Sequence, residues 1–174
     1  RVTLLTHCKS AATAALSRTP ELMVRVVDDL TAFETMIQSM DAIAIGPGLG
    51  QSNWAVACLE AAKSHHKPTV VDADALNLIA QGKVVFHDNA VFTPHLGEAA
   101  RLLNCSVSDV QSDPVEAAFE LQHNLGGVIV LKGAGSIVCD GYKAYICNFG
   151  NPGMASAGMG DLLSGIIATF LAQG

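Results

Sequence analysis

The sequence predicts an α/β fold with a mostly parallel sheet and helices on both faces. Three observations lead to this fold class. Half of the 174 residues are hydrophobic, whereas only 15% are charged and 5% are aromatic. Short apolar runs alternate with stretches of helical period, and turns rich in glycine separate them. The composition excludes a disordered chain, a coiled coil and a disulfide scaffold.

The individual elements can be assigned in chain order. Four stretches with apolar residues at helical spacing are predicted as helices, the first capped by Ser52 and the third opened by Asp113-Pro114: 53–67, 97–103, 113–125 and 158–170. Two further segments flank Asp140-Gly141, a pair typical of hairpin turns: 136–139 and 144–147. Five short apolar runs, bounded by glycine, proline or polar residues, are predicted as strands: 2–6, 41–45, 69–71, 90–92 and 127–131.

The two ends of the chain bear on its domain organisation. The sequence begins at Arg1 without a methionine and enters a strand at once, and it stops at Gly174 directly after an apolar helical stretch. The length is that of one ordinary domain. We therefore expect residues 1–174 to form one partial domain that is truncated at both ends.

The charge balance argues against a nucleic-acid partner. Ten Lys and Arg residues stand against 16 Asp and Glu residues, so the formal charge is −6, and no basic cluster offsets it locally. A phosphate ligand still fits this composition, because helix N-termini bind anions without basic side chains. No apolar run is long enough to cross a bilayer and no signal peptide opens the chain, so we expect a cytoplasmic protein without a membrane partner.

The five cysteines are odd in number and contain no C-x-x-C pair. We expect them to be buried, reduced thiols, as is usual in the cytoplasm. A zinc site is not expected, because clustered ligands are missing from the sequence.

Ligands of a parallel sheet bind where its strands lead into helices, and the loops of this sequence are unusual there. The loop 46–50, Gly-Pro-Gly-Leu-Gly, has three glycines that let the backbone approach a ligand, although a plain turn explains it equally well. Asp72 and Asp74 follow the strand 69–71 on the same side of an extended backbone. They could hold a cation or hydroxyl groups, or one could cap the next helix.

Two polar residues follow the strand 90–92. His95 and Glu98 resemble half of a transition-metal site, but no third ligand is evident. Glu98 has two open interpretations: a carboxylate that holds a water on Mg²⁺, or a first-turn residue that the helix dipole favours.

The most specific segment is 150–161, which is rich in glycine and leads into the last apolar helix. Such a turn directs several free N–H groups at one point, where an anion would also meet the positive end of the helix dipole. Asp161 then lies in the first helical turn and is expected to act as a general base, accepting a hydroxyl proton as that hydroxyl attacks a phosphoryl group. The segment 132–136, with one lysine and two glycines after a strand, suits the phosphate or sugar of a nucleotide.

Together these segments resemble the ribokinase-like superfamily and, within it, the ADP/ATP-dependent NAD(P)H-hydrate dehydratases, which repair hydrated nicotinamide cofactors. The matching segments follow in order over essentially the whole chain: 46–50, 72–77, 93–95, 97–103, 131–135 and 150–165.

The resemblance implies a hydro-lyase reaction. Members of the family remove water from the S epimer of NADHX or NADPHX, and they couple this to conversion of ADP to AMP in bacteria or of ATP to ADP in eukaryotes. It also implies a homo-oligomer, such as a tetramer, and an epimerase domain that is often fused upstream.

The resemblance further implies a role for each matching residue. Asp161 is the catalytic base, and Glu98 orders Mg²⁺ through a water molecule. The anion hole consists of the N–H groups of four residues: Ala157, Gly158, Met159 and Gly160. The nucleotide is expected to contact the loop after the strand and the helix start: Lys132, Gly133, Ala134, Gly135, Ser136 and Gly160. The hydrated cofactor is expected to contact residues of the other four candidate segments: Gly48, Gly50, Asp74, His95, Asn151 and Asp161.

The sequence departs from the family pattern at two positions. Leu96 stands where proline is usual, and Ala157 stands where glycine is usual. If position 157 requires a positive φ, alanine there costs about 1 kcal/mol and shifts an N–H group of the anion hole.

Two other functions agree with the same motifs. One is a ribokinase-like kinase of a small alcohol, of the hydroxyethylthiazole or pyridoxine type, which would share the glycine-rich helix start. The other is a nucleotide-binding fragment without catalytic activity.

Overall fold

The computed structural model describes residues 2–86 and 89–174, which form two compact units, 1–40 and 41–174. In the smaller unit, α1 packs against a sheet of two parallel strands. Only the strand at 2–6 is among the predicted elements. The prediction that residues 1–174 form one partial domain stays a prediction. The elements of the smaller unit are β1 (Thr3–Thr6), α1 (Lys9–Arg18), β2 (Met23–Val26) and α2 (Leu30–Gln38).

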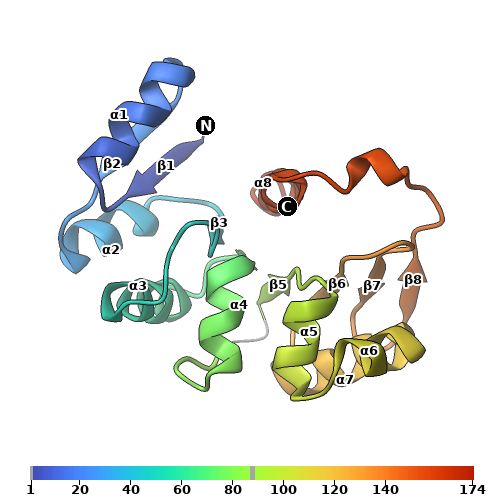
Figure 1. Cartoon of the computed structure of the whole chain (residues 1–174). Helices are drawn as coiled ribbons and strands as arrows, with labels where there is room; N and C mark the ends of the chain where they lie inside the picture. Colours follow the sequence, from blue (N-terminus) through green and yellow to red (C-terminus); the bar gives the residue numbers. More distant parts are fainter. Residues whose placement is uncertain (1, 87–88) are drawn as a thin grey trace. The chain divides into compact units, whose positions relative to one another are not determined.

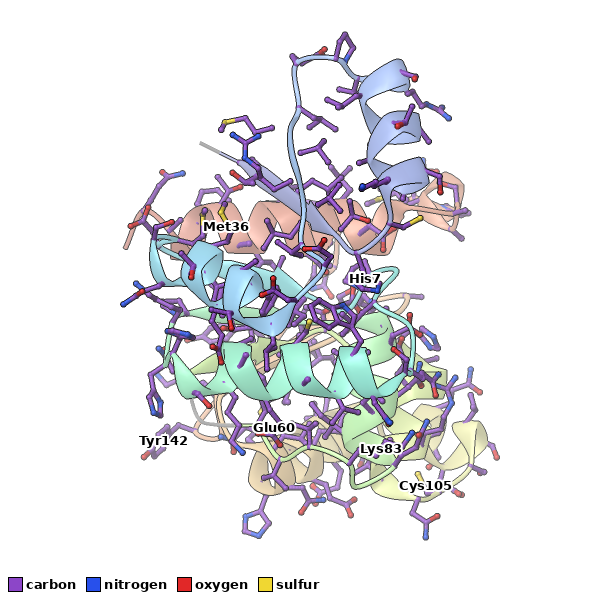
Figure 2. The ribbon with its side chains drawn as sticks, turned by 90° about the vertical axis from the view of Figure 1, so that its left-hand side faces the viewer. His7, Met36, Glu60, Lys83, Cys105 and Tyr142 are labelled. Atoms are coloured by element: carbon purple, nitrogen blue, oxygen red, sulfur yellow. The ribbon has the colours of Figure 1, made fainter. Side chains whose placement is uncertain are left out.

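The larger unit is built on a six-stranded sheet whose strands lie side by side in chain order (Figure 1). Its first four strands are parallel, and the last two form the predicted hairpin, in which β7 is antiparallel to β6 and β8 is antiparallel to β7. Tyr142 projects from the hairpin turn (Figure 2), where Asp140 accepts hydrogen bonds from two backbone N–H groups. The predicted mostly parallel sheet is therefore confirmed. The strands are β3 (Ile43–Ile45), β4 (Thr69–Val71), β5 (Ala90–Phe92), β6 (Val128–Leu131), β7 (Ile137–Cys139) and β8 (Ala144–Ile146).

The sequential strand order decides which face each helix covers. Right-handed crossovers between strands that advance in one direction place their helices on one face of the sheet. The opposite face is left for α8 (Met159–Leu171), which follows the hairpin and packs on β3 and β4 (Figure 1). Helices thus cover both faces of this sheet, as predicted. The crossover helices are α3 (Asn53–Ser64), α4 (Ala73–Ala80), α5 (Leu96–Leu103), α6 (Val107–Ser112) and α7 (Pro114–Leu125).

The helices of the larger unit differ in how they begin. Each of α3 to α7 has an N-cap side chain that accepts a hydrogen bond from a backbone N–H of its first turn, which satisfies a group that the helix itself leaves open. The start of α8 has no such side chain, because its N-cap is Gly158. The caps of α3 to α7 are Ser52, Asp72, His95, Ser106 and Asp113.

The core of the larger unit lies between the sheet and the crossover helices. Phe92 in the central strand β5 is fully buried, and its ring meets that of Phe86 edge-on with 6.2 Å between centroids. Side chains from α3, α4 and α7 complete this layer. Within the described part of the chain, every helix is too short or too polar to cross a bilayer.

The cysteines are all unpaired, but the prediction that they are buried is wrong for three of them. Cys58 and Cys139 are buried, and burial raises the pKa of the Cys58 thiol to about 11. Cys8, Cys105 and Cys147 are exposed, and the first two lie beside the start or the end of a helix. Cys105 is labelled in Figure 2.

Gly46 shows why the loop after β3 needs glycine. Its φ is +129°, and a Cβ atom at this position would overlap the backbone carbonyl of Asp72. The missing side chain lets the β3 loop lie directly against the end of β4. Two candidate loops are thereby brought together by backbone alone.

Candidate active site

The candidate loops meet at the edge of the sheet where the parallel strands end. The backbone N–H of Gly50 donates to Asp74 Oδ2 at 2.8 Å, which joins the β3 loop to the start of α4. The backbone N–H of Lys132 donates to the carbonyl of Pro94 at 2.8 Å, which joins the loops after β5 and β6. These two contacts join the loops in pairs at this edge of the sheet.

Asp72 is the most buried charged residue at this edge, with 2% of its surface exposed. Its Oδ1 accepts from Lys132 Nζ at 2.8 Å and from the N–H of Ala73 at 2.9 Å. Its Oδ2 accepts from Ser164 Oγ on α8 at 2.7 Å. One carboxylate thus connects β4, β6 and α8. We call Asp72, Lys132 and Ser164 the Asp72 cluster.

The two aspartates after β4 have different roles. Asp72 caps α4, whereas Asp74 lies in the first turn of that helix and accepts from the N–H of Gly50. The interpretation that one of them caps the helix is correct, and the capping residue is Asp72. Asp74 fixes the glycine loop, in which Gly48 and Gly50 both have positive φ angles.

His95 and Glu98 form a reciprocal capping box at the start of α5. His95 Nδ1 accepts from the N–H groups of Gly97 and Glu98, at 2.9 and 3.3 Å. Glu98 Oε2 accepts from the N–H of His95 at 2.8 Å. Since Nδ1 accepts these bonds, the ring nitrogen left to donate is Nε2, which lies 3.6 Å from Glu98 Oε1. The half-exposed ring can present the N–H of Nε2 either to Glu98 or to a ligand at the sheet edge.

The site offers one carboxylate for Mg²⁺. No three His, Cys, Asp or Glu side chains of residues 2–86 and 89–174 are close enough together to hold a metal ion. Glu98 is nearly buried, and one of its oxygens is engaged by the backbone. This donor set fits Mg²⁺ bound mainly by nucleotide phosphates and water, since that ion commonly uses only one or two carboxylates.

The predicted nucleotide loop borders a cavity. The loop is held as a tight turn, because Ser136 Oγ donates to the carbonyl of Gly133 at 3.2 Å. The side chain of Lys132 does not extend freely into this cavity, because it is paired with Asp72. The cavity has a volume of about 330 Å³, and its walls are mostly apolar: Leu96, Gln111, Pro114, Leu131, Lys132, Gly133, Ala134, Gly135 and Ile137.

The start of α8 has the features expected of an anion site. Gly158 has a φ of +87° and turns the chain into the helix without a side-chain cap. Of the four predicted N–H donors, that of Met159 bonds weakly to the carbonyl of Ser156, at 3.4 Å. Asp161 lies in the first turn with an exposed side chain. Its carboxylate is therefore accessible and next to open backbone donors.

The structure shows the local conformation of two other residues of this segment, Asn151 and Ala157. Asn151 caps the short 3₁₀ helix η1 (Pro152–Met154) by accepting from the N–H of Gly153 at 2.8 Å, so its oxygen is already engaged. Ala157 is not among the residues with positive φ. The strain considered for alanine at this position is therefore absent, and the left-handed residue is Gly158.

Gly158→Ala in the intact protein is expected to lower the free energy of unfolding by about 1 kcal/mol. A Cβ there has open space around it, so the cost comes from the positive φ alone. Gly165→Ala is the matched control in the same helix. Its backbone is helical and its surroundings are open, so alanine should stabilise by about 1 kcal/mol. Urea unfolding of both variants would reveal opposite signs, and equal signs would contradict the assigned conformations.

Sequence reasoning missed the Asp72 cluster as a unit. Asp72 and Lys132 were noted only within their separate loops, and Ser164 was not considered. The one available signal was a lone serine in the otherwise apolar run from Leu162 to Ile167. A hydroxyl on an apolar helix that packs on a sheet requires a buried partner.

Comparison with known proteins agrees with this geometry. A family model described as NAD(P)H-hydrate dehydratase matches residues 2–174. The bifunctional NAD(P)H-hydrate repair enzyme Nnr of Escherichia coli is 47% identical over 175 residues, which is 99% of this chain and 33% of the relative. The chain thus spans about a third of that protein's length.

Two solved structures share the fold. A ribokinase-like superfamily protein of Enterococcus faecalis has a TM-score of 0.84 and 32% identity, over 98% of this chain and 61% of its own. The ADP/ATP-dependent NAD(P)H-hydrate dehydratase of Bacillus subtilis, co-crystallised with ATP and Mg²⁺, has a TM-score of 0.79 and 26% identity, over 98% of this chain and 62% of its own. The fold is therefore ribokinase-like, and since the family model extends over nearly the whole sequence, the chain belongs to the NAD(P)H-hydrate dehydratase family.

Proposed function

We propose that the protein containing this chain dehydrates (6S)-NADHX or (6S)-NADPHX to NADH or NADPH and converts ADP to AMP in the same cycle. The observation that carries the proposal is the open start of α8. It combines uncapped backbone N–H groups with an exposed carboxylate, at an edge where four loops meet. Membership of the dehydratase family supports the choice of substrate.

The chemistry follows from the leaving group. Hydroxide leaves poorly at neutral pH, whereas phosphate leaves readily. In the proposed reaction Asp161 accepts the proton of the C6 hydroxyl as its oxygen attacks the terminal phosphorus of ADP and AMP departs. Loss of phosphate from C6 and of a proton from the neighbouring ring carbon then restores the double bond.

The backbone around Asp161 would stabilise the transferred phosphoryl group. The N–H groups of Ala157, Gly158 and Gly160, and more weakly that of Met159, are placed at the positive end of the α8 dipole. When bound, Mg²⁺ held through a water on Glu98 would offset the negative charge of the phosphates. His95 would donate a hydrogen bond from Nε2 to the hydrate.

The nucleotide is proposed to lie along the segment 132–136. The adjoining cavity of about 330 Å³ has apolar walls that suit a base, and the backbone of the loop suits a ribose or phosphate. The Gly48 and Gly50 backbone, held in place through Asp74, would face the hydrate together with His95. Asn151 is proposed to contact the hydrate with the N–H of its amide, because its oxygen holds Gly153.

The proposal extends to the whole protein. We propose a homo-oligomer and an additional epimerase domain, the latter supported by the word bifunctional in the name of the E. coli relative. A cytoplasmic location is proposed because all five cysteines are unpaired, as in reducing compartments.

The experiment is a direct assay of the intact protein with NADHX, ADP and Mg²⁺, in which the absorbance of reduced nicotinamide is followed. We expect the absorbance of reduced nicotinamide to return, with one AMP formed per NADH. Parallel reactions contain ATP with hydroxyethylthiazole or pyridoxine. A phosphorylated alcohol without regained NADH would identify a small-alcohol kinase, and calorimetric ADP binding without any turnover would identify a silent nucleotide-binding protein.

A further inference from the structure

The Asp72 carboxylate has no part in the proposed proton transfer, yet it is the most buried charge at the site. Both of its oxygens are occupied, one by Lys132 and the backbone and the other by Ser164. Its partners are 60 and 92 residues away in the sequence. Asp72 is therefore unavailable to a ligand unless these bonds break, and its role must be exerted on the protein itself.

The Asp72 cluster is not an efficient way to stabilise the fold. Removing a carboxylate and an ammonium from water costs about as much as their attraction returns, so apolar residues of similar size would serve equally well. Ala73, next to Asp72, also has a φ of +50°, which costs an alanine about 1 kcal/mol or more. Unlike apolar packing, such an arrangement fixes the positions of the hydrogen-bonded residues.

The element whose geometry it fixes is α8. Ser164 is the only buried residue of that helix, whereas Leu162, Ile166 and Phe170 are exposed. Leu163 and Ile167, on the same side of α8, are half-buried and help to place that side on the sheet, but apolar contacts alone do not fix the exact rotation of the helix about its axis. The hydrogen bond from Ser164 to Asp72 determines it, because a hydroxyl at one position on the helix must meet one oxygen at the end of β4.

The first turn of α8 lies directly on the ion pair. A Cβ built on Gly160 would be 3.4 Å from Lys132 Nζ and 3.9 Å from Asp72 Oδ2. Gly160 precedes Ser164 by one turn, and Asp161 precedes it by three residues, so all three belong to the same end of the helix. A rotation or shift at Ser164 is thus transmitted to the Asp161 carboxylate and to the open N–H groups.

We propose that Asp72 is a positioning residue for the reaction and that it acts on Asp161 through Ser164. The Asp72 cluster sets the rotation and depth of the first turn of α8, so that the base and the N–H groups address the same phosphoryl group. This inference rests on the function proposed above. The proposed role of Asp72 is to stabilise the transition state, in which the base and the N–H donors must be aligned. Its effect on the binding of ADP should be smaller.

The test is Ser164→Ala in the intact protein, which removes the bond to Asp72 and leaves Asp161 and Lys132 unchanged. The kcat for NADHX should fall about 10- to 100-fold, because a displacement of about 1 Å has effects of that size. The KM for ADP should stay within about twofold of the wild-type value, since the loop 132–136 is untouched.

Thr69→Val is the matched control. Thr69 is fully buried at the first position of β4, the strand that Asp72 follows, and its hydroxyl donates to the carbonyl of Lys67 at 2.8 Å. The substitution removes a buried hydroxyl whose hydrogen bond does not involve α8, and it should lower the thermal midpoint without lowering kcat.

The outcomes separate the two proposals. An inactive wild-type protein would overturn the proposed function. An active wild type with an unchanged kcat in Ser164→Ala would overturn the positioning role alone, as would a loss expressed only in the KM for ADP. An equal loss of kcat in Thr69→Val would reduce the effect to general destabilisation, and would overturn the positioning role as well.

Discussion

Asp161→Asn is expected to lower kcat for NADHX dehydration by about 10³-fold, within the range that a general base contributes. The amide has the shape of the carboxylate but cannot accept the hydroxyl proton. ADP affinity should change little, because the backbone N–H groups of the helix start and the loop 132–136 are retained. Steady-state kinetics together with calorimetry of ADP binding measures both quantities on the same preparation.

The control for this variant is Glu116→Gln. Glu116 is also an exposed carboxylate in the first turn of a helix, α7, and its neutralisation removes the same favourable interaction with a helix dipole. Its activity should equal that of the wild type. If Asp161→Asn retained activity, the assignment of the base would be wrong. If it lost ADP binding instead, Asp161 would be a ligand contact and not the base.

Asp72→Asn is expected to reduce the free energy of unfolding by about 3 kcal/mol. Removal of one partner of a buried pair leaves the other charge without compensation, and typical losses are 3–5 kcal/mol. We expect a loss of stability at the lower end of this range because the Lys132 side chain retains 19% exposure. Urea unfolding of the intact protein, monitored by a probe in this domain, measures the change.

The double variant Asp72→Asn/Lys132→Met separates charge from shape. It removes both charges while methionine keeps the length of the lysine stem, so most of the lost stability should return. A single variant as stable as the wild type would contradict a paired, buried carboxylate. A double variant no more stable than the single one would show that the unpaired ammonium is not the source of the loss.

Much of the larger unit could be predicted because its signals are local. The buried strands are continuous apolar runs, and the caps Ser52 and Asp113 each lie immediately before an apolar periodic stretch. Glycine-rich turns and the Asp140-Gly141 pair mark the loops and the hairpin. Since parallel strands end at one edge, the convergence of the candidate loops followed from the strand order alone.

Two of the elements that sequence reasoning missed, α1 and α6, have weak local signals. Helix α1 buries only Ala12, and alanine adds little to an apolar periodicity. Helix α6 has six residues and buries only Val110, so it is too short to show a period. The Asp72 cluster depends on contacts 60 and 92 residues apart, which no local pattern encodes. The exposure of three cysteines was missed for a related reason. The residue type alone does not show whether a side chain faces the core or the solvent.

The distance along the chain between Asp72 and Ser164 has a consequence for biosynthesis. Ribosomes release a polypeptide from its N-terminus, so the carboxylate emerges 92 residues before the serine that hydrogen-bonds to it. Until that serine arrives, the strands of the larger unit can pair, but the proposed base Asp161 has no fixed orientation. The proposed activity therefore requires synthesis to have passed Ser164, although the strands of the larger unit can pair before that point.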